Sequence, residues 1–125
     1  MEANIIDIQN NMVCLSTEFG SFWGEWKSNI PPKKEKYNLE LDSDDILIFD
    51  NIKESYLPNT EIKSDGKSVV LCGFVEEITD EIMFLRLRDS LIMIQLSENE
   101  EFSMFLKKFV NVNLKNISFY DIKVY

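Results

Sequence analysis

The segment from Ile82 to Phe109 constrains the fold of this chain more than any other. Leucine alternates with arginine over Leu85–Arg88, which is the period-two pattern of a β-strand with one face in water. The following run, Leu91–Leu96, is apolar at nearly every position, so the pattern predicts a second strand covered on both faces. Between the two strands, Asp89 and Ser90 leave room only for a hairpin turn.

The end of this segment predicts a helix over about 98–109. Four apolar residues recur at the spacing that places them on one helical face: Phe102, Phe105, Leu106 and Phe109. Ser97 and Glu100 have the spacing of a capping box, and acids at the start and lysines at the end complement the helix dipole. We expect the phenylalanines to pack inward against the hairpin, with a Phe-lined ligand pocket as the alternative.

The rest of the chain predicts further strands, at 12–17, 37–42, 46–49, 68–78, 110–114 and 117–124. Residues 5–8 form either a short first strand or a docking arm. The stretch 52–67, with a turn at Asp65–Gly66, reads as a loop with one short edge strand at 61–63. No internal repeat is visible. The prediction is a single domain over 1–125 of the α+β class, either a mainly antiparallel curved sheet or a partly open OB-like β-barrel, with one helix.

Glycines and aromatic residues mark special positions. Phe19–Trp26 holds four aromatics and two glycines, which predicts a bent strand or a glycine-opened loop. Gly73, inside the long strand, predicts a bend or a close approach of another backbone, and a phase slip at 119–120 predicts a bulge. Three aromatic side chains either pack over one end of the sheet or stand exposed as interface anchors: Trp23, Trp26 and Tyr37.

Several kinds of chemistry are excluded or unsupported. The chain has no histidine, so His-dependent nucleophilic catalysis and His metal ligation are excluded. Cys14 and Cys72 stand alone in apolar runs and predict buried free thiols. Phosphate-cradling glycine motifs are absent, and Asp42–Asp45 lacks the glycine and glutamate of a calcium loop. We therefore expect no enzyme, no metal and no cofactor.

The sequence also bears on location. No apolar run approaches the roughly 18 residues of a membrane span. The first residues lack the basic and apolar regions of a signal peptide. We expect a cytoplasmic protein with no membrane partner.

Charge points to a protein partner. Acids number 22 against 13 lysines and arginines, a net charge of −9. Such a chain is a poor nucleic-acid binder, because phosphate contacts need cations, but it suits a basic protein. Two acid clusters, which could also be ordinary solvated turns, are the candidate binding residues: Asp42, Asp44, Asp45, Asp50 and Glu54 in the first, and Glu76, Glu77, Asp80 and Glu81 in the second.

In size, charge and strand pattern the chain resembles the small acidic immunity proteins of bacterial contact-dependent inhibition and polymorphic-toxin systems. The likeness covers about half of the chain and is closest in the C-terminal half, at Leu71–Ile78, Leu85–Ile94 and Ile117–Ile122. It implies a protein that binds a cognate toxin domain, often a nuclease with a basic cleft, and blocks substrate entry. No binding residue is carried over from that family.

Two other functions stay open. One is a small β-rich adaptor or scaffold subunit of a larger assembly, held by apolar contacts. The other is an OB-type oligonucleotide-binding module, which the aromatic content favours and the charge opposes.

Overall fold

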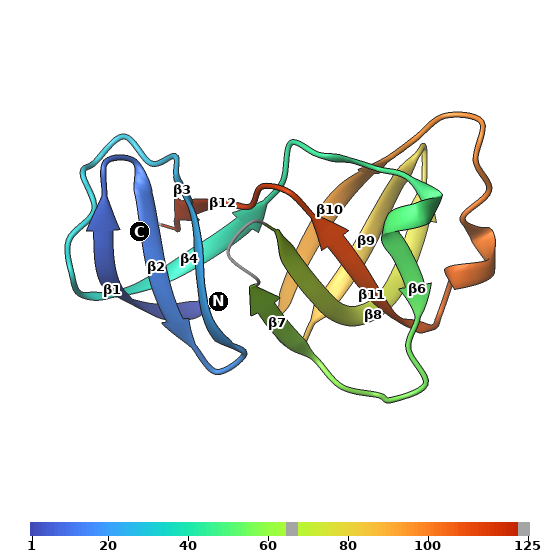
Figure 1. The fold of residues 1–125 in the computed structure, drawn as a ribbon, viewed down its shortest axis with the longest axis horizontal. Helices are drawn as coiled ribbons and strands as arrows, with labels where there is room; N and C mark the ends of the chain where they lie inside the picture. The colour runs from blue at the N-terminus through green and yellow to red at the C-terminus, as the bar shows by residue number, and fades with distance from the viewer. Residues whose placement is uncertain (65–67, 123–125) are drawn as a thin grey trace.

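The computed structural model describes residues 1–64 and 68–122, which form two β units that lie side by side (Figure 1). The first unit is a closed barrel in the order β1-β2-β3-β12-β4. Its strands are β1 (Glu2–Gln9), β2 (Met12–Thr17), β3 (Gly20–Trp26), β4 (Lys36–Asp42) and β12 (Ser118–Asp121). The predicted turn at Asp65–Gly66 and the end of the predicted last strand, at Val124, lie outside the described residues.

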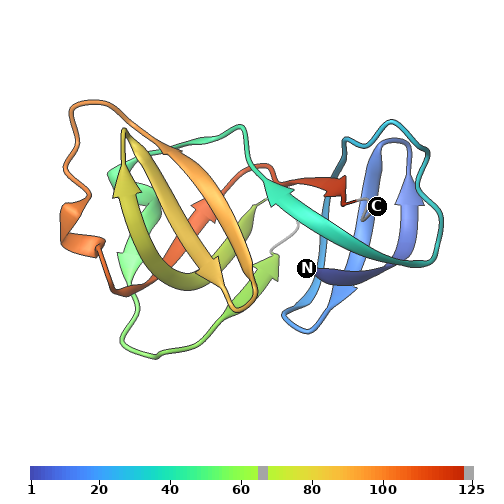
Figure 2. The same cartoon turned by 180° about the vertical axis from the view of Figure 1, so that it is seen from behind.

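The second unit is a curved sheet in the order β5-β10-β9-β8-β11-β6, with β7 on an edge of β8. Its strands are β5 (Ile46–Leu47), β6 (Ile52–Glu54), β7 (Glu61–Ser64), β8 (Val69–Thr79), β9 (Ile82–Leu87), β10 (Ser90–Leu96) and β11 (Phe109–Leu114). The two end strands, β5 and β6, are separated only by Ile48 and the 3-10 turn η1 (Phe49–Asn51). The sheet therefore curls until its ends meet, as the view from behind also shows (Figure 2).

The two units repeat one pattern of strands, although the sequence analysis found no internal repeat. The β1–β2–β3 meander and the β8–β9–β10 meander match residue by residue at a separation of 70 positions, so that Ile5↔Leu15 corresponds to Val75↔Leu85. Each first strand has its register shift at the same place, Ile5/Asp7 and Val75/Glu77. Over these three strands only Ile8/Ile78 and Leu15/Leu85 keep the same residue. The repeat is therefore a repeat of apolar pattern and turn position.

In each repeat the meander is followed by a fourth strand, β4 or β11, that pairs within its own unit, and then by a segment that joins the other unit. This last segment is the fifth strand of the repeat. β12, which follows β11, completes the first barrel by pairing parallel with β3 and antiparallel with β4. The β5–β6 segment, which follows β4, pairs parallel with β10 and antiparallel with β11. The bonds correspond as well: Lys27 N–H donates to Phe119 O at 3.0 Å and Ser97 N–H to Leu47 O at 2.9 Å.

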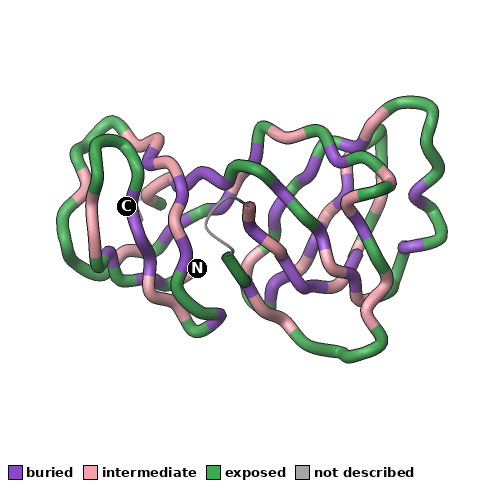
Figure 3. The backbone as a smooth tube through the Cα atoms, viewed as in Figure 1, coloured by how far each residue is buried: buried purple, intermediate pink, exposed green. Residues whose placement is uncertain are grey.

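A single apolar cluster runs through both units (Figure 3). Alternation along each strand turns one set of side chains inward, as for Leu85 and Leu87, which are fully buried. Gly73 is held by close packing, since a Cβ there would lie 2.6 Å from the Arg86 carbonyl oxygen, which confirms the predicted close approach. Cys14 and Cys72 are buried free thiols, and burial raises the pKa of both.

The predicted helix over 98–109 is wrong. The described residues contain no α-helix, and this stretch holds only a 3-10 turn, η2 (Ser103–Phe105). Asn99 and Lys107 have φ of 65° and 61°, which a right-handed helix cannot accommodate. Phe102 and Phe105 are nonetheless buried and pack at a tilt against Phe49, with ring centroids 5.9 and 5.6 Å from that of Phe49.

The residues predicted to cap that helix make other contacts. Ser97 Oγ donates to the Glu100 carboxylate, which also accepts the Phe49 N–H at 3.0 Å. Phe109 begins β11 and packs on Phe74. The helical spacing of the phenylalanines therefore indicated burial of their side chains. An irregular loop, not a helix, buries two of them.

Three other details differ from the sequence predictions. β10 has one wet face, with Met93 51% exposed, because its outer side borders an open hollow beside β4. β12 pairs with β4 in unbroken register, so the bulge at 119–120 is absent. The phase slip arises because Ile117, Ser118 and Phe119 are all buried where the chain crosses between the units. β6 lies within the predicted loop 52–67, while the edge strand expected at 61–63 is present as β7.

Because each unit contains a strand from the other repeat, the chain should unfold in one transition. Leu15→Ala and Leu85→Ala each leave a cavity in the core of one unit and should each cost about 2–5 kcal/mol. Both variants should shift the same single urea transition, monitored by tryptophan fluorescence and far-UV circular dichroism. Leu57→Ala, at a 69% exposed position, is the control. Two separated transitions would contradict the exchange.

Gly73→Ala tests the close approach between β8 and β9. The added methyl group meets backbone, which cannot yield as a flexible side chain can, so we expect a loss of about 1–3 kcal/mol in unfolding free energy. Asn113→Ala, on the exposed side of β11, should change stability little. Equal stability of the two variants in chemical denaturation would show that the strands can separate freely here.

Candidate functional site

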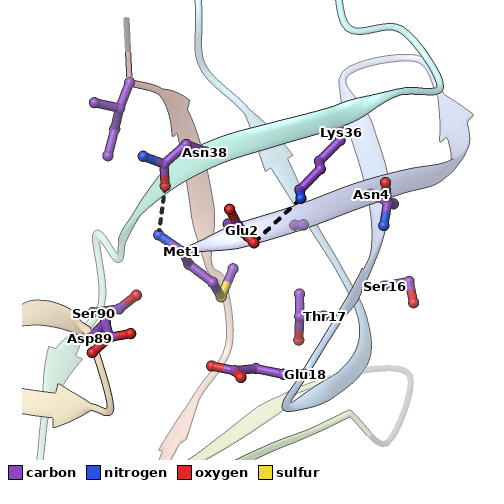
Figure 4. A pocket seen from close by; sticks show the side chains of 12 residues that line it. Met1, Glu2, Asn4, Ser16, Thr17, Glu18, Lys36, Asn38, Asp89 and Ser90 are labelled. Carbon is purple, nitrogen blue, oxygen red and sulfur yellow. Dashed lines mark hydrogen bonds and ion pairs between the residues drawn. The ribbon is translucent and has the colours of Figure 1, made fainter. Parts of the chain in front are cut away.

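A cleft of about 730 Å³ lies between the two units (Figure 4). The start of β1, the end of β2 and the outer side of β4 form one wall, and the β9–β10 turn forms the other. The lining is mainly polar and comprises Met1, Glu2, Ala3, Asn4, Ser16, Thr17, Glu18, Lys36, Asn38, Asp89, Ser90 and Ile122. Its size lies within the range of ordinary ligand pockets.

Three carboxylates from different parts of the chain surround this space. Glu2 lies 3.5 Å from Lys36, and Glu18 lies 3.0 Å from Arg88. Asp89 has no hydrogen-bond or ion-pair partner among the described residues. Exposed pairs of this kind are weak and exchange readily with solvent or with another cation. Lys36 and the Met1 ammonium group also line the cleft, so three carboxylates face two cations and the formal charge of the lining is −1. Among the three acids, Asp89 is the one that no described side-chain cation pairs with.

The Met1 ammonium group lies at the edge of the cleft. It donates to Asn38 Oδ1 at 3.1 Å and to the Leu39 carbonyl at 2.8 Å. Burial lowers the pKa of this ammonium, while the nearby carboxylates Glu2 and Asp89 act in the opposite direction. These bonds hold the first residues of the chain against β4.

A second, smaller hollow continues along β4. It has a volume of about 260 Å³ and is lined by Glu40, Leu41, Asp42, Leu91, Met93 and Tyr120. Glu40 is the next outward residue of β4 after Asn38, so the hollow extends the surface of the cleft. Leu91 and Met93 are exposed there beside two acids. The junction between the units thus combines negative charge with apolar area.

The first predicted acid cluster is divided by the fold. Asp42 lines the second hollow. Asp44 lies 2.7 Å from Lys27 Nζ, and this hydrogen bond raises the pKa of Lys27. Asp45 accepts the backbone N–H groups of Lys115 and Asn116, so it holds the crossing between β11 and β12.

Two members of that cluster lie further along the chain, in the second unit. Asp50 is exposed on η1. Glu54 pairs with Lys108 at 2.9 Å.

The second predicted cluster lies at the far end of β9 from the cleft. Glu76 binds Arg86 at 2.8 Å, and Glu77 accepts the Thr79 hydroxyl at 3.0 Å. Asp80 and Glu81 form the exposed β8–β9 turn, with φ of 53° and 63°. The two predicted clusters therefore do not form one face.

The three predicted aromatic anchors differ in exposure. Trp26 is buried in the core, its Nε1 donates to the Ile30 carbonyl at 2.8 Å, and its ring meets the edge of Tyr37. Tyr37 is half-buried, and burial raises its pKa. Trp23 is half-buried beside a shallow hollow near Met12. Only Trp23 and Tyr37 keep surface for a partner.

The cleft residues Glu2, Glu18 and Asp89 were missed by the sequence analysis. They stand singly, at a strand start and in two hairpin turns, so no local run of acids marks them. The only available signal was the repeat, which places the β2–β3 and β9–β10 turns at matching positions.

Comparisons with protein-family models, with curated proteins and with solved structures find no match to this chain. Across residues 1–64 and 68–122, no helix is long and apolar enough to cross a membrane. Within the same ranges, no three carboxylate or thiol side chains gather as a metal site.

Asp45 offers a test that separates a structural acid from a binding one. Asp45→Ala leaves two backbone N–H groups of the crossing segment without their acceptor and should lower the unfolding free energy by about 1–3 kcal/mol. Asp50→Ala removes an exposed carboxylate and should change it by less than about 0.5 kcal/mol. Urea denaturation of both variants provides the comparison. Equal losses would refute the structural role of Asp45.

Proposed function

We propose that this chain is a stoichiometric binding protein that neutralises a cognate toxin domain, basic and of the nuclease type, by covering its active-site cleft. The observation that carries the proposal is the convergence of Glu2, Glu18 and Asp89 on one cleft between two strand-built units. Glu2 lies on β1, and Glu18 and Asp89 lie in tight turns between paired strands, so little entropy is lost in ordering them on binding.

The surface suits a basic protein for two reasons. Carboxylates along the cleft and β4 give a negative potential that steers a cationic partner and speeds its association. Leu91 and Met93 then supply apolar area beside those charges. A nuclease active site must itself attract phosphate, so its cations match the same carboxylates.

One observation favours an adaptor instead. Ile46 lies on the end strand β5, where it pairs with Gln95 of β10, and it is 61% exposed. Ile48, two residues on, is 42% exposed. An adaptor held by this apolar edge would bind with little dependence on salt. The oligonucleotide alternative gains no support, since the cleft side chains include three carboxylates and one lysine.

The decisive variants carry the same change of charge at two places. The cleft variant is Glu2→Gln with Glu18→Gln and Asp89→Asn, and the matched control is Glu77→Gln with Asp80→Asn and Glu81→Gln. The partner is first captured on the tagged wild-type protein at low salt and identified by mass spectrometry. Its association rate with each variant is then measured over a series of salt concentrations.

We expect the cleft variant to associate about tenfold more slowly or worse at low ionic strength, with a shallower salt dependence. The control should match wild type, and the captured toxin domain should be enzymatically inactive while bound. Loss of binding in the control alone would assign the interface to the β8–β9 turn. An association rate that is unchanged in both variants and at all salt concentrations would favour the adaptor and refute the proposal.

A further inference from the structure

In the second unit, β7 occupies a slot between two strands of different repeats. It pairs antiparallel with the first residues of β8, with Glu61 opposite Cys72 and Ile62 opposite Leu71. On its other side the Ile62 N–H donates to the Phe19 carbonyl at 3.3 Å. A Cβ on Gly20 would lie 3.1 Å from the Ile62 carbonyl oxygen, so β7 also lies close against the start of β3.

The cleft is the matching slot of the first unit. The repeat relates Leu71 and Cys72 of β8 to Met1 and Glu2 of β1. It likewise relates the Phe19–Gly20 pair to Asp89 and Ser90, which form the opposite wall of the cleft. The four counterparts of the residues that hold β7 thus all line this cleft, and no described strand lies between them.

The backbone in this slot has free strand edges. β1 pairs with β4 from Glu2 onward, but its pairing with β2 begins only at Asn4. Met1 O accepts the Leu39 N–H, and alternate residues of a strand bond to opposite neighbours, so the main-chain groups of Glu2 point toward the cleft. Among the described residues these groups have no backbone partner.

We propose that the cleft binds an extended, basic segment of a partner protein by strand addition, in the position that β7 takes in the second unit. Main-chain hydrogen bonds would supply the affinity, as in other cases in which a peptide joins a sheet edge. Glu2, Glu18 and Asp89 select lysine or arginine side chains on the segment. This inference rests on the proposed function for the origin of the segment, and its test needs no partner.

A random peptide library displayed on phage is selected against the full chain at low salt, and enriched peptides are synthesised. Each peptide is then made in versions with a single N-methylated backbone amide, which removes one main-chain donor. Affinities are measured by titration calorimetry for the wild type, for Glu18→Gln with Asp89→Asn, and for the remote control Asp80→Asn with Glu81→Gln. Amide hydrogen exchange of Glu2 and Ser90 is followed by NMR.

The expected result is a set of lysine- or arginine-containing peptides whose binding falls about tenfold or more on N-methylation at alternate positions. The cleft variant should weaken binding severalfold, the remote control should not, and the Glu2 amide should exchange more slowly in the complex. Failure to select any peptide, indifference to N-methylation at every position, or protection confined to Leu91–Gln95 would overturn strand addition. If peptides bind as described while the captured partner binds the cleft variant as well as it binds wild type, the toxin-inhibitor function is refuted. Strand addition in the cleft is then still supported.

Discussion

The pairing of β12 with β3 and β4 is the interaction on which the rest of the structure depends. Without it the first barrel is open between β3 and β4, and the apolar faces of Phe22 and Phe119, whose rings pack 5.7 Å apart, meet water. The matching exchange by β5 and β6 fixes the second unit in the same way. The cleft exists because these exchanges hold two rounded sheets against each other, leaving a hollow where their turns meet. The stability of the fold and the shape of the site therefore have one origin.

The sequence revealed strand positions well and strand partners poorly. The apolar pattern located β2 at its observed bounds and β4, β8 and β11 to within one residue at each end, because a strand with one buried face must alternate. The helix prediction failed because Phe102, Phe105 and Phe109 recur at helical spacing for a different reason. Two are buried by an irregular loop and the third begins a strand. Nothing local could show the exchange of β12, since it depends on contacts between residues far apart in the chain.

The same limit explains the outcome for the candidate site. Runs of acid are visible in a sequence, but Asp44 and Glu54 prove to be paired with lysines, and Asp45 supports backbone. Glu2, Glu18 and Asp89 stand singly in the sequence and gain their proposed role only by meeting across the junction. Local charge density therefore does not show which acids the fold brings together. The matching positions in the structural repeat do show which turns meet at the junction.

The exchange of fifth strands also bears on how such a chain could arise. One repeat alone, a meander followed by two strands, cannot close its own barrel when its fifth strand reaches into a neighbour. Two copies of it would satisfy each other through a two-fold axis, as in a domain-swapped homodimer. The present chain has the form of that dimer joined end to end. Once joined, the halves no longer need to stay identical, so one slot could acquire β7 while the other stayed open.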